Sequence, residues 1–148
     1  MKHPVSDAEA AGPRVLVYSD DPKLRAAVLT AVGSRPAPEL GAVEWLECAR
    51  ADEVLALLDA GGVSVAVLDG EARPTGGLGL AKQVKDELVD CPMTLVLIAR
   101  KDDSWLAKWS MADAVETLPV DPSALSAAIA GLLRLRASAV PVRRTAAL

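Results

Sequence analysis

The amino-acid sequence predicts an α/β fold in which five parallel strands form one doubly wound sheet covered by helices on both faces. Short apolar segments alternate five times with segments whose apolar residues recur at helical spacing. Most of the strand segments are apolar throughout, which is typical of strands buried on both faces of a parallel sheet. With 148 residues, the chain has room for one such domain.

The elements can be placed in order along the chain. Strands are predicted at 14–19, 43–48, 63–68, 94–99 and 114–118. Helices are predicted at 22–32, 51–60, 78–89, 104–111 and 122–135. Pro22 and Pro122 suit the first turn of a helix, Asp121 stands at an N-cap position, and Gly33 and Gly61 end helices. We therefore expect a flexible lead-in at 1–13, a folded domain at 14–135 and a basic tail at 136–148.

The composition limits the kinds of protein to which this chain can belong. Phe is absent and aromatic residues make up only 3%, so the core is expected to consist of Val, Leu, Ile and Ala, with Trp45 inside it. Cys48 and Cys91 are too few for a disulfide framework and are predicted to be buried free thiols. With no signal peptide or membrane-spanning run in view, a reduced cytoplasmic setting is expected.

Charge is distributed unevenly along the chain. The net charge is −4, yet residues 134–148 contain only basic charges, from Arg134, Arg136, Arg143 and Arg144. The remainder therefore carries −8, which argues against direct binding of nucleic acid. The four arginines are candidates for contact with an acidic partner or an anionic membrane surface; the alternative is a solvated tail.

Three carboxylates follow predicted strand ends. Asp20 and Asp21 come after the first strand and Asp69 after the third. Because the carboxyl ends of parallel strands meet at one edge of the sheet, these groups are expected to converge, and oxygen ligands of this kind favour Mg²⁺. Two alternatives remain open: Asp21 caps the helix that begins at Pro22, or Arg73 pairs with the carboxylates in place of a metal ion.

Several of these segments resemble the receiver domain of bacterial response regulators. The resemblance rests on Val17–Asp21, Val67–Asp69, Pro74 and Gly77–Leu78, and it covers about residues 14–135. It implies a flavodoxin-like (βα)5 fold with strand order 2-1-3-4-5. It also implies that Asp69 is the phosphoacceptor and that Asp20 and Asp21 hold Mg²⁺ beside it.

The sequence departs from the receiver pattern at three positions. Ile98 replaces a Ser or Thr after the fourth strand, Leu118 replaces a Lys after the fifth, and Val115 replaces an aromatic residue. Leu118 cannot neutralise phosphoryl oxygens, and Ile98 cannot donate a hydrogen bond to them. A phosphoryl group that makes little differential contact cannot shift a conformational equilibrium. We therefore expect a degenerate, non-catalytic receiver that requires no cofactor.

A binding role is the leading hypothesis for such a receiver. Trp105 and Trp109 lie four residues apart on one predicted helix; at least one is expected to be buried and the other to contact a partner. Residues 69–88 and 100–109 resemble orphan regulators of mycobacteria linked with NADH–quinone oxidoreductase, respiratory complex I. This resemblance implies an accessory or regulatory subunit that reaches the membrane only through that complex.

Two alternative functions remain open. One is a phosphorelay in which a sensor kinase phosphorylates Asp69. The other is transcription regulation through an unseen partner, because no DNA-binding helices follow the last helix. His3 is the only histidine and lies in the lead-in, so a His-dependent hydrolase or metal site has no support.

Overall fold

The computed structural model describes the backbone of residues 12–147 and the side chains of residues 12–139. Most of the predicted lead-in, including His3, therefore lies outside the described residues, as do the side chains of Arg143 and Arg144.

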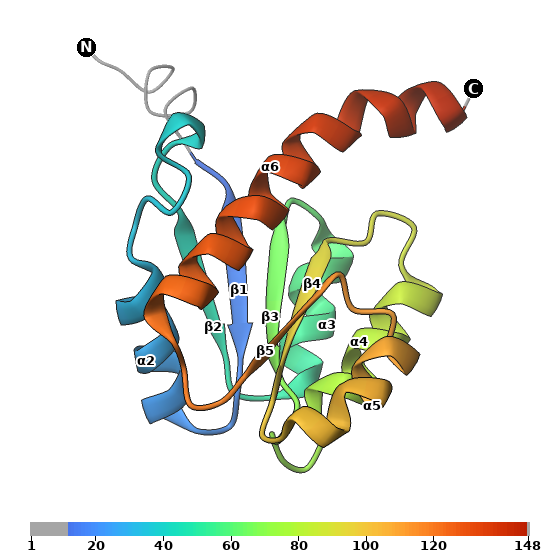
Figure 1. Ribbon diagram of the computed structural model, residues 1–148. Coiled ribbons are helices and arrows are strands. Elements are labelled where there is room, and N and C mark those ends of the chain that lie inside the picture. The colour runs from blue at the N-terminus through green and yellow to red at the C-terminus, as the bar shows by residue number, and fades with distance from the viewer. Residues whose placement is uncertain (1–11, 148) are drawn as a thin grey trace.

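The five strands form one parallel sheet in the order β2-β1-β3-β4-β5, which confirms the predicted topology (Figure 1). Their bounds are β1 (Arg14–Tyr18), β2 (Glu44–Cys48), β3 (Val65–Asp69), β4 (Met93–Ile98) and β5 (Ala114–Thr117). The register pairs Tyr18 with Leu68 and Leu68 with Val96. The carboxyl ends of β1, β3 and β4 therefore lie next to one another.

The helices cover both faces of this sheet, as Figure 1 shows. They are α2 (Pro22–Val32), α3 (Ala51–Ala60), α4 (Gly77–Glu87), α5 (Ser104–Trp109) and α6 (Pro122–Ala147), with two 3₁₀ turns, η1 (Pro38–Leu40) and η2 (Lys101–Asp103). Helices α2 and α6 pack on one face, and α3, α4 and α5 pack on the other. Along the part of the chain that the structure describes, no helix combines the length and apolar character needed to cross a bilayer.

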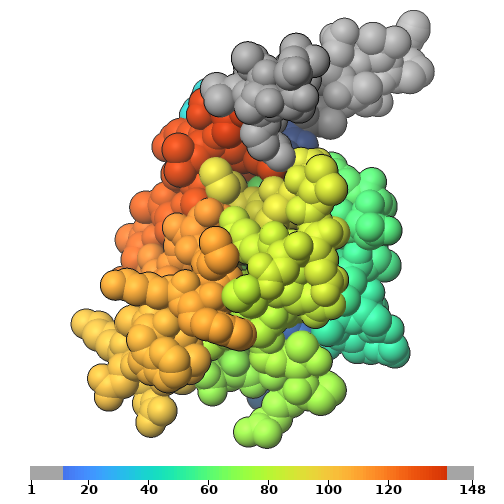
Figure 2. All heavy atoms as spheres, turned by 90° about the vertical axis from the view of Figure 1, so that its right-hand side faces the viewer, coloured from blue at the N-terminus to red at the C-terminus, as the bar shows by residue number. Residues whose placement is uncertain are grey.

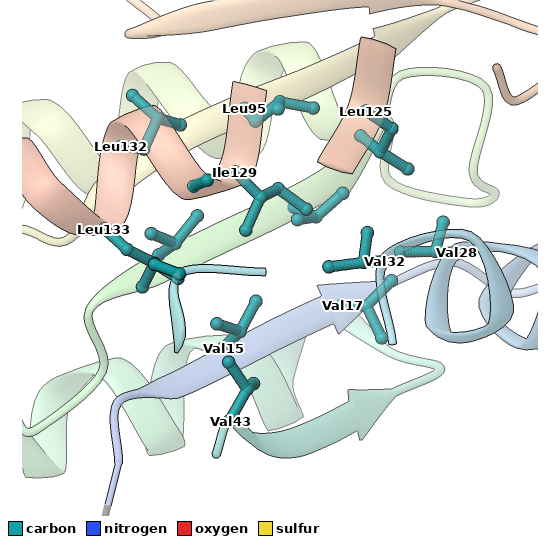
Figure 3. Packing of buried hydrophobic residues seen from close by; sticks show 14 of the residues in the cluster. Val15, Val17, Val28, Val32, Val43, Leu95, Leu125, Ile129, Leu132 and Leu133 are labelled. Atoms are coloured by element: carbon teal, nitrogen blue, oxygen red, sulfur yellow. The ribbon is translucent and has the colours of Figure 1, made fainter. Parts of the chain in front are cut away.

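The core has two layers because successive strand residues point to opposite faces. In β1, Val15 and Val17 face α2 and α6, where they pack with Ile129 and Leu133 (Figure 3), whereas Leu16 faces the other layer. Burial of each such aliphatic side chain contributes about 1.5–3 kcal/mol. The chain therefore obtains its stability from Val, Leu, Ile and Ala, as its composition requires.

Two glycines allow the loop after β3 to approach the sheet closely. A Cβ atom at Gly77 would lie 2.6 Å from the carbonyl oxygen of Asp69, and one at Gly70 would lie 2.6 Å from that of Leu97. A larger residue at either position would push the backbone apart. The start of α4 can thus sit directly over the end of β3.

The last helix is longer than the sequence pattern indicated. It was expected to end near Leu135, but α6 continues to Ala147. Residues 136–147 are rich in Ala and Arg, which favour helix formation, although Pro141 among them opposes it. Figure 1 shows this end of α6 extending away from the sheet and the other helices.

Candidate functional site

Asp69 lies at the carboxyl end of β3 and is only 4% exposed. The hydroxyl of Ser19 donates a hydrogen bond to its Oδ2 (2.8 Å), and the main-chain N–H of Glu71 donates to its Oδ1 (2.8 Å). Ser19 is fully buried, and its hydroxyl oxygen also accepts from the N–H of Asp21 (3.0 Å). Each oxygen of the candidate phosphoacceptor thus has a partner within the protein.

Sequence reasoning had missed Ser19. The residue directly follows β1, at the same edge of the sheet as Asp69, and this position was the available signal. A serine hydroxyl at that position does not stand out in a sequence, because it is uncharged, whereas the neighbouring carboxylates suggest metal ligands.

The two neighbouring carboxylates are used elsewhere. Asp21 is the N-cap of α2, where its Oδ1 accepts from the N–H of Lys23 (2.9 Å), as the capping alternative predicted. Asp20 accepts through Oδ1 from the main-chain N–H of Arg73 (3.1 Å). Among the described residues, the guanidinium of Arg73 forms no ion pair with these carboxylates; it is the Arg73 backbone that approaches them.

The arrangement of the three carboxylates does not fit a bound magnesium ion. Within residues 12–139, no three acidic, histidine or cysteine side chains gather closely enough to hold a metal ion. An ion shared by Asp20, Asp21 and Asp69 would compete with the helix-cap contact of Asp21 and with the hydrogen bonds that both oxygens of Asp69 accept. The three residues predicted as one ligand set therefore lie at the same edge of the sheet with separate roles.

The loop between β3 and α4 is fastened to the sheet around Asp69. The phenol of Tyr18 donates to the carbonyl oxygen of Thr75, and the N–H of Gly70 donates to that of Leu97 (2.8 Å). Burial, followed by the negative charges of Asp20 and Asp69, raises the pKa of the Tyr18 phenol above its usual value. The phenol therefore remains a donor well into alkaline pH.

The three altered receiver positions have apolar surroundings. Ile98 is buried, Leu118 is half-buried against the α2–α6 layer of the core, and Val115 is 37% exposed. The N–H of Leu118 donates to the carbonyl oxygen of Ile98 (2.8 Å), which ties the ends of β4 and β5 together. Neither side chain carries a group that could bind phosphoryl oxygens.

Both tryptophans of α5 are exposed, Trp105 by 66% and Trp109 by 52%, so the expectation that one ring is buried was wrong. The residue of this short helix that faces the core is Ala107. Positions two residues before and after it point about 200° away, toward solvent, at 100° per residue. Figure 2 shows the molecule from the side of α4 and α5.

Of the other residues predicted to be buried, only some are fully buried. Trp45 is half-buried and donates its indole N–H to the carbonyl oxygen of Gly33 (3.2 Å). Cys48 is buried as predicted, and burial raises the pKa of its thiol to about 11. Cys91 is half-buried, and burial raises its pKa as well.

Two of the candidate partner-binding arginines form ion pairs within the protein. Arg134 donates to both carboxylate oxygens of Glu39 (2.6 and 3.2 Å) in an exposed pair that also lowers the pKa of Glu39. Arg136, whose side chain is 13% exposed, donates to the carbonyl oxygen of Cys91 and the carboxylate of Asp90, each at 2.8 Å. The first part of the predicted basic tail therefore holds α6 against the body.

Comparison with known proteins identifies relatives. No family model matches the chain. The chain is 50% identical over 121 residues to an uncharacterized response regulatory protein of Mycobacterium tuberculosis, in strains H37Rv and CDC 1551 alike; the match covers 82% of this chain and 91% of that protein.

Solved receiver domains share the fold at lower identity. The signal receiver domain of a Vibrio parahaemolyticus LuxO repressor protein superposes with a TM-score of 0.76 at 13% identity, covering 89% of this chain and 98% of that one. The receiver domain of Francisella response regulator 1452 gives a TM-score of 0.70 at 21% identity, covering 83% and 98%. The chain therefore belongs to the response regulators, and its folded part is a receiver domain.

Proposed function

We propose that this receiver is a non-catalytic protein-binding module whose contact surface is formed by α5 and the residues that follow it. The observation that carries the proposal is the exposure of Trp105 (66%) and Trp109 (52%), with Met111 (57%) and Val115 beside them in the chain. Exposed tryptophan is strongly enriched among the residues that dominate binding energy at protein interfaces.

The apolar switch positions support binding over phosphate signalling. A charge-assisted contact to phosphoryl oxygens contributes about 1.5–3 kcal/mol, and Leu118 has no charge to supply it. Ile98 is buried and has no hydroxyl group. A phosphoryl group on Asp69 would therefore bias the fourth and fifth strands weakly, because the difference in contacts sets the shift.

We further propose that the partner is the NADH–quinone oxidoreductase complex, contacted on the cytoplasmic side of the membrane. The support is the resemblance of residues 69–88 and 100–109 to orphan regulators of mycobacteria linked with that complex. The second of these segments contains both exposed tryptophans. Attachment to the membrane would then occur through the partner, with no direct contact to nucleic acid.

Affinity purification from native membranes tests this proposal. The tagged protein is expected to co-purify complex I subunits. Trp105→Ala or Trp109→Ala is expected to weaken the affinity by about 30-fold or more, the effect of losing about 2 kcal/mol at an interface hot spot, and so to reduce their recovery. Val89→Ala is the matched control, because Val89 is 100% exposed and lies at the end of the sheet opposite to Asp69, after α4. Absence of complex I subunits, or an equal loss with Val89→Ala, would contradict the proposal.

A phosphorelay component is the second candidate. The position of Asp69 at the end of β3 and the likeness to a response regulatory protein favour it. Incubation with a small-molecule phosphodonor, followed by intact mass measurement, separates the two functions. A mass gain that Asp69→Ala abolishes would support a relay fed by a sensor kinase, whereas an unchanged mass supports the binding role.

A further inference from the structure

We infer that Ser19, together with the main-chain amides of the β3–α4 loop, holds the Asp69 carboxylate in place without a divalent cation, so that this edge of the sheet does not bind Mg²⁺ at millimolar concentration. This inference goes beyond the proposed binding role and is independent of it. It rests on the hydrogen bonds that the carboxylates already make.

The hydroxyl of Ser19 supplies a hydrogen-bond donor to the Asp69 carboxylate from within the protein. It donates to Asp69 Oδ2 at 2.8 Å while accepting from the N–H of Asp21 at 3.0 Å, so both its donor and an acceptor site are in use. Ser19 is fully buried and Asp69 is 4% exposed. A buried carboxylate is stable only when its charge is compensated, and hydrogen-bond donors provide that compensation here.

The remaining carboxylates are already oriented by hydrogen bonds within the protein. Mg²⁺ requires near-octahedral oxygen ligands at about 2.0–2.1 Å. Asp21 is turned toward the N–H of Lys23 at the start of α2, and Asp20 toward the N–H of Arg73. A bound ion would therefore compete with hydrogen bonds that already orient these two carboxylates at a helix cap and toward the loop.

The loop itself is already closed over the site. Hydrogen bonds join Thr75 to Tyr18, Gly70 to Leu97 and Arg73 to Asp20. Three points along the loop are therefore attached to the carboxyl ends of two strands, β1 and β4. Moving the loop away from Asp69 would require several of these hydrogen bonds to break together. The loop thus keeps Ser19 and Asp69 in contact.

On this inference, the uncharged side chain of Ser19 is the reason that the site needs no metal ion. A carboxylate at position 19 would lie in contact with the carboxylate of Asp69 and would precede Asp20 in the chain. Buried like charges repel each other unless a cation lies between them. Ser19→Asp should therefore convert the site into one that needs a divalent ion. Ser19→Asn is the matched control, since the Asn side chain has nearly the same shape as that of Asp but carries no charge.

The test is thermal unfolding of the full chain in about 10 mM Mg²⁺ or in EDTA. For the wild type, and likewise for Ser19→Asn, the unfolding temperature in Mg²⁺ is expected to equal that in EDTA. Ser19→Asp is expected to unfold at a lower temperature in EDTA and to regain about 3–6 °C in Mg²⁺, as binding with a dissociation constant of roughly 1 mM would give.

Two outcomes would overturn the inference. One is an increase of the wild-type unfolding temperature in Mg²⁺ that Asp69→Asn abolishes; the other is a response of Ser19→Asp no larger than that of Ser19→Asn. If Ser19→Asp does not fold, calorimetric titration of the wild type with Mg²⁺ still decides: heat of saturable binding at millimolar concentration refutes the inference, and its absence supports it.

Discussion

The hydrogen bond from Ser19 to Asp69 should make a measurable contribution to stability. Removing the hydroxyl in Ser19→Ala leaves Oδ2 of a buried carboxylate without its donor, and leaves the N–H of Asp21 without its acceptor. Ser19 is fully buried and Asp69 is 4% exposed, so water cannot readily replace the lost donor to Oδ2.

The expected size of the effect follows from this burial. A hydrogen bond to a charged group contributes about 1.5–3 kcal/mol, and the backbone amide lies nearer the surface and adds little. A protein of this size loses about 2–4 °C in unfolding temperature per kcal/mol. Ser19→Ala is therefore expected to unfold roughly 3–12 °C below the wild type.

Urea unfolding followed by circular dichroism measures the free energy, and a double-mutant cycle with Asp69→Ala isolates the pair. Ser138→Ala is the control: its hydroxyl also bonds to a protein acceptor, the carbonyl oxygen of Leu135, but on an exposed turn of α6. That variant should stay within about 0.5 kcal/mol of the wild type. A coupling energy near zero between Ser19 and Asp69 would refute the reasoning.

Three further predictions concern titration and ion pairing. Burial raises the pKa of the Cys48 thiol to about 11. At pH 8 its thiolate fraction, and hence its rate of reaction with a thiol reagent, should therefore be about two orders of magnitude below that of an ordinary thiol. Labelling of Cys48 as fast as in the unfolded chain would contradict this. The raised pKa of Tyr18 means that its contribution to the free energy of unfolding is fully present below its ordinary pKa of about 10 and is lost as the pH rises through the raised value. Unfolding measured between about pH 9 and 12 should show a smaller alkaline loss in Tyr18→Phe than in the wild type, and an equal loss would argue against this assignment. Arg136→Ala should lower the free energy of unfolding by about 1–2 kcal/mol, because that side chain is mostly buried between two partners. Arg134→Ala should have a much smaller effect, because its ion pair with Glu39 is exposed to solvent. Equal effects of the two substitutions would show that burial does not set the difference.

Local pattern was sufficient to predict much of the fold. The apolar runs at Val65–Leu68 and Leu95–Ile98 are found as the buried central strands β3 and β4, because a strand covered on both faces needs apolar side chains in both directions. Turn and cap residues such as Asp21 and Gly33 mark the ends of α2, because their effect depends only on neighbours in the chain. The position of Asp69 at a strand end follows from the same local signals.

The orientation of individual side chains required the tertiary structure. The fourth helix begins at Ser104 as expected, yet sequence could not tell that Ala107 would face the core and leave both Trp105 and Trp109 in solvent. Spacing shows which residues share a face; contact with the neighbouring elements decides which face is buried.

By itself, then, the sequence determined an α/β receiver fold with Asp69 at a strand end and apolar residues at positions 98 and 118. Only the tertiary structure decided that Ser19, fifty residues away, donates to Asp69 and that Arg136 holds the loop at Asp90. The physical reason is distance along the chain: periodicity and capping act over a few residues, whereas these bonds depend on the register of β1 against β3 and on the packing of α6.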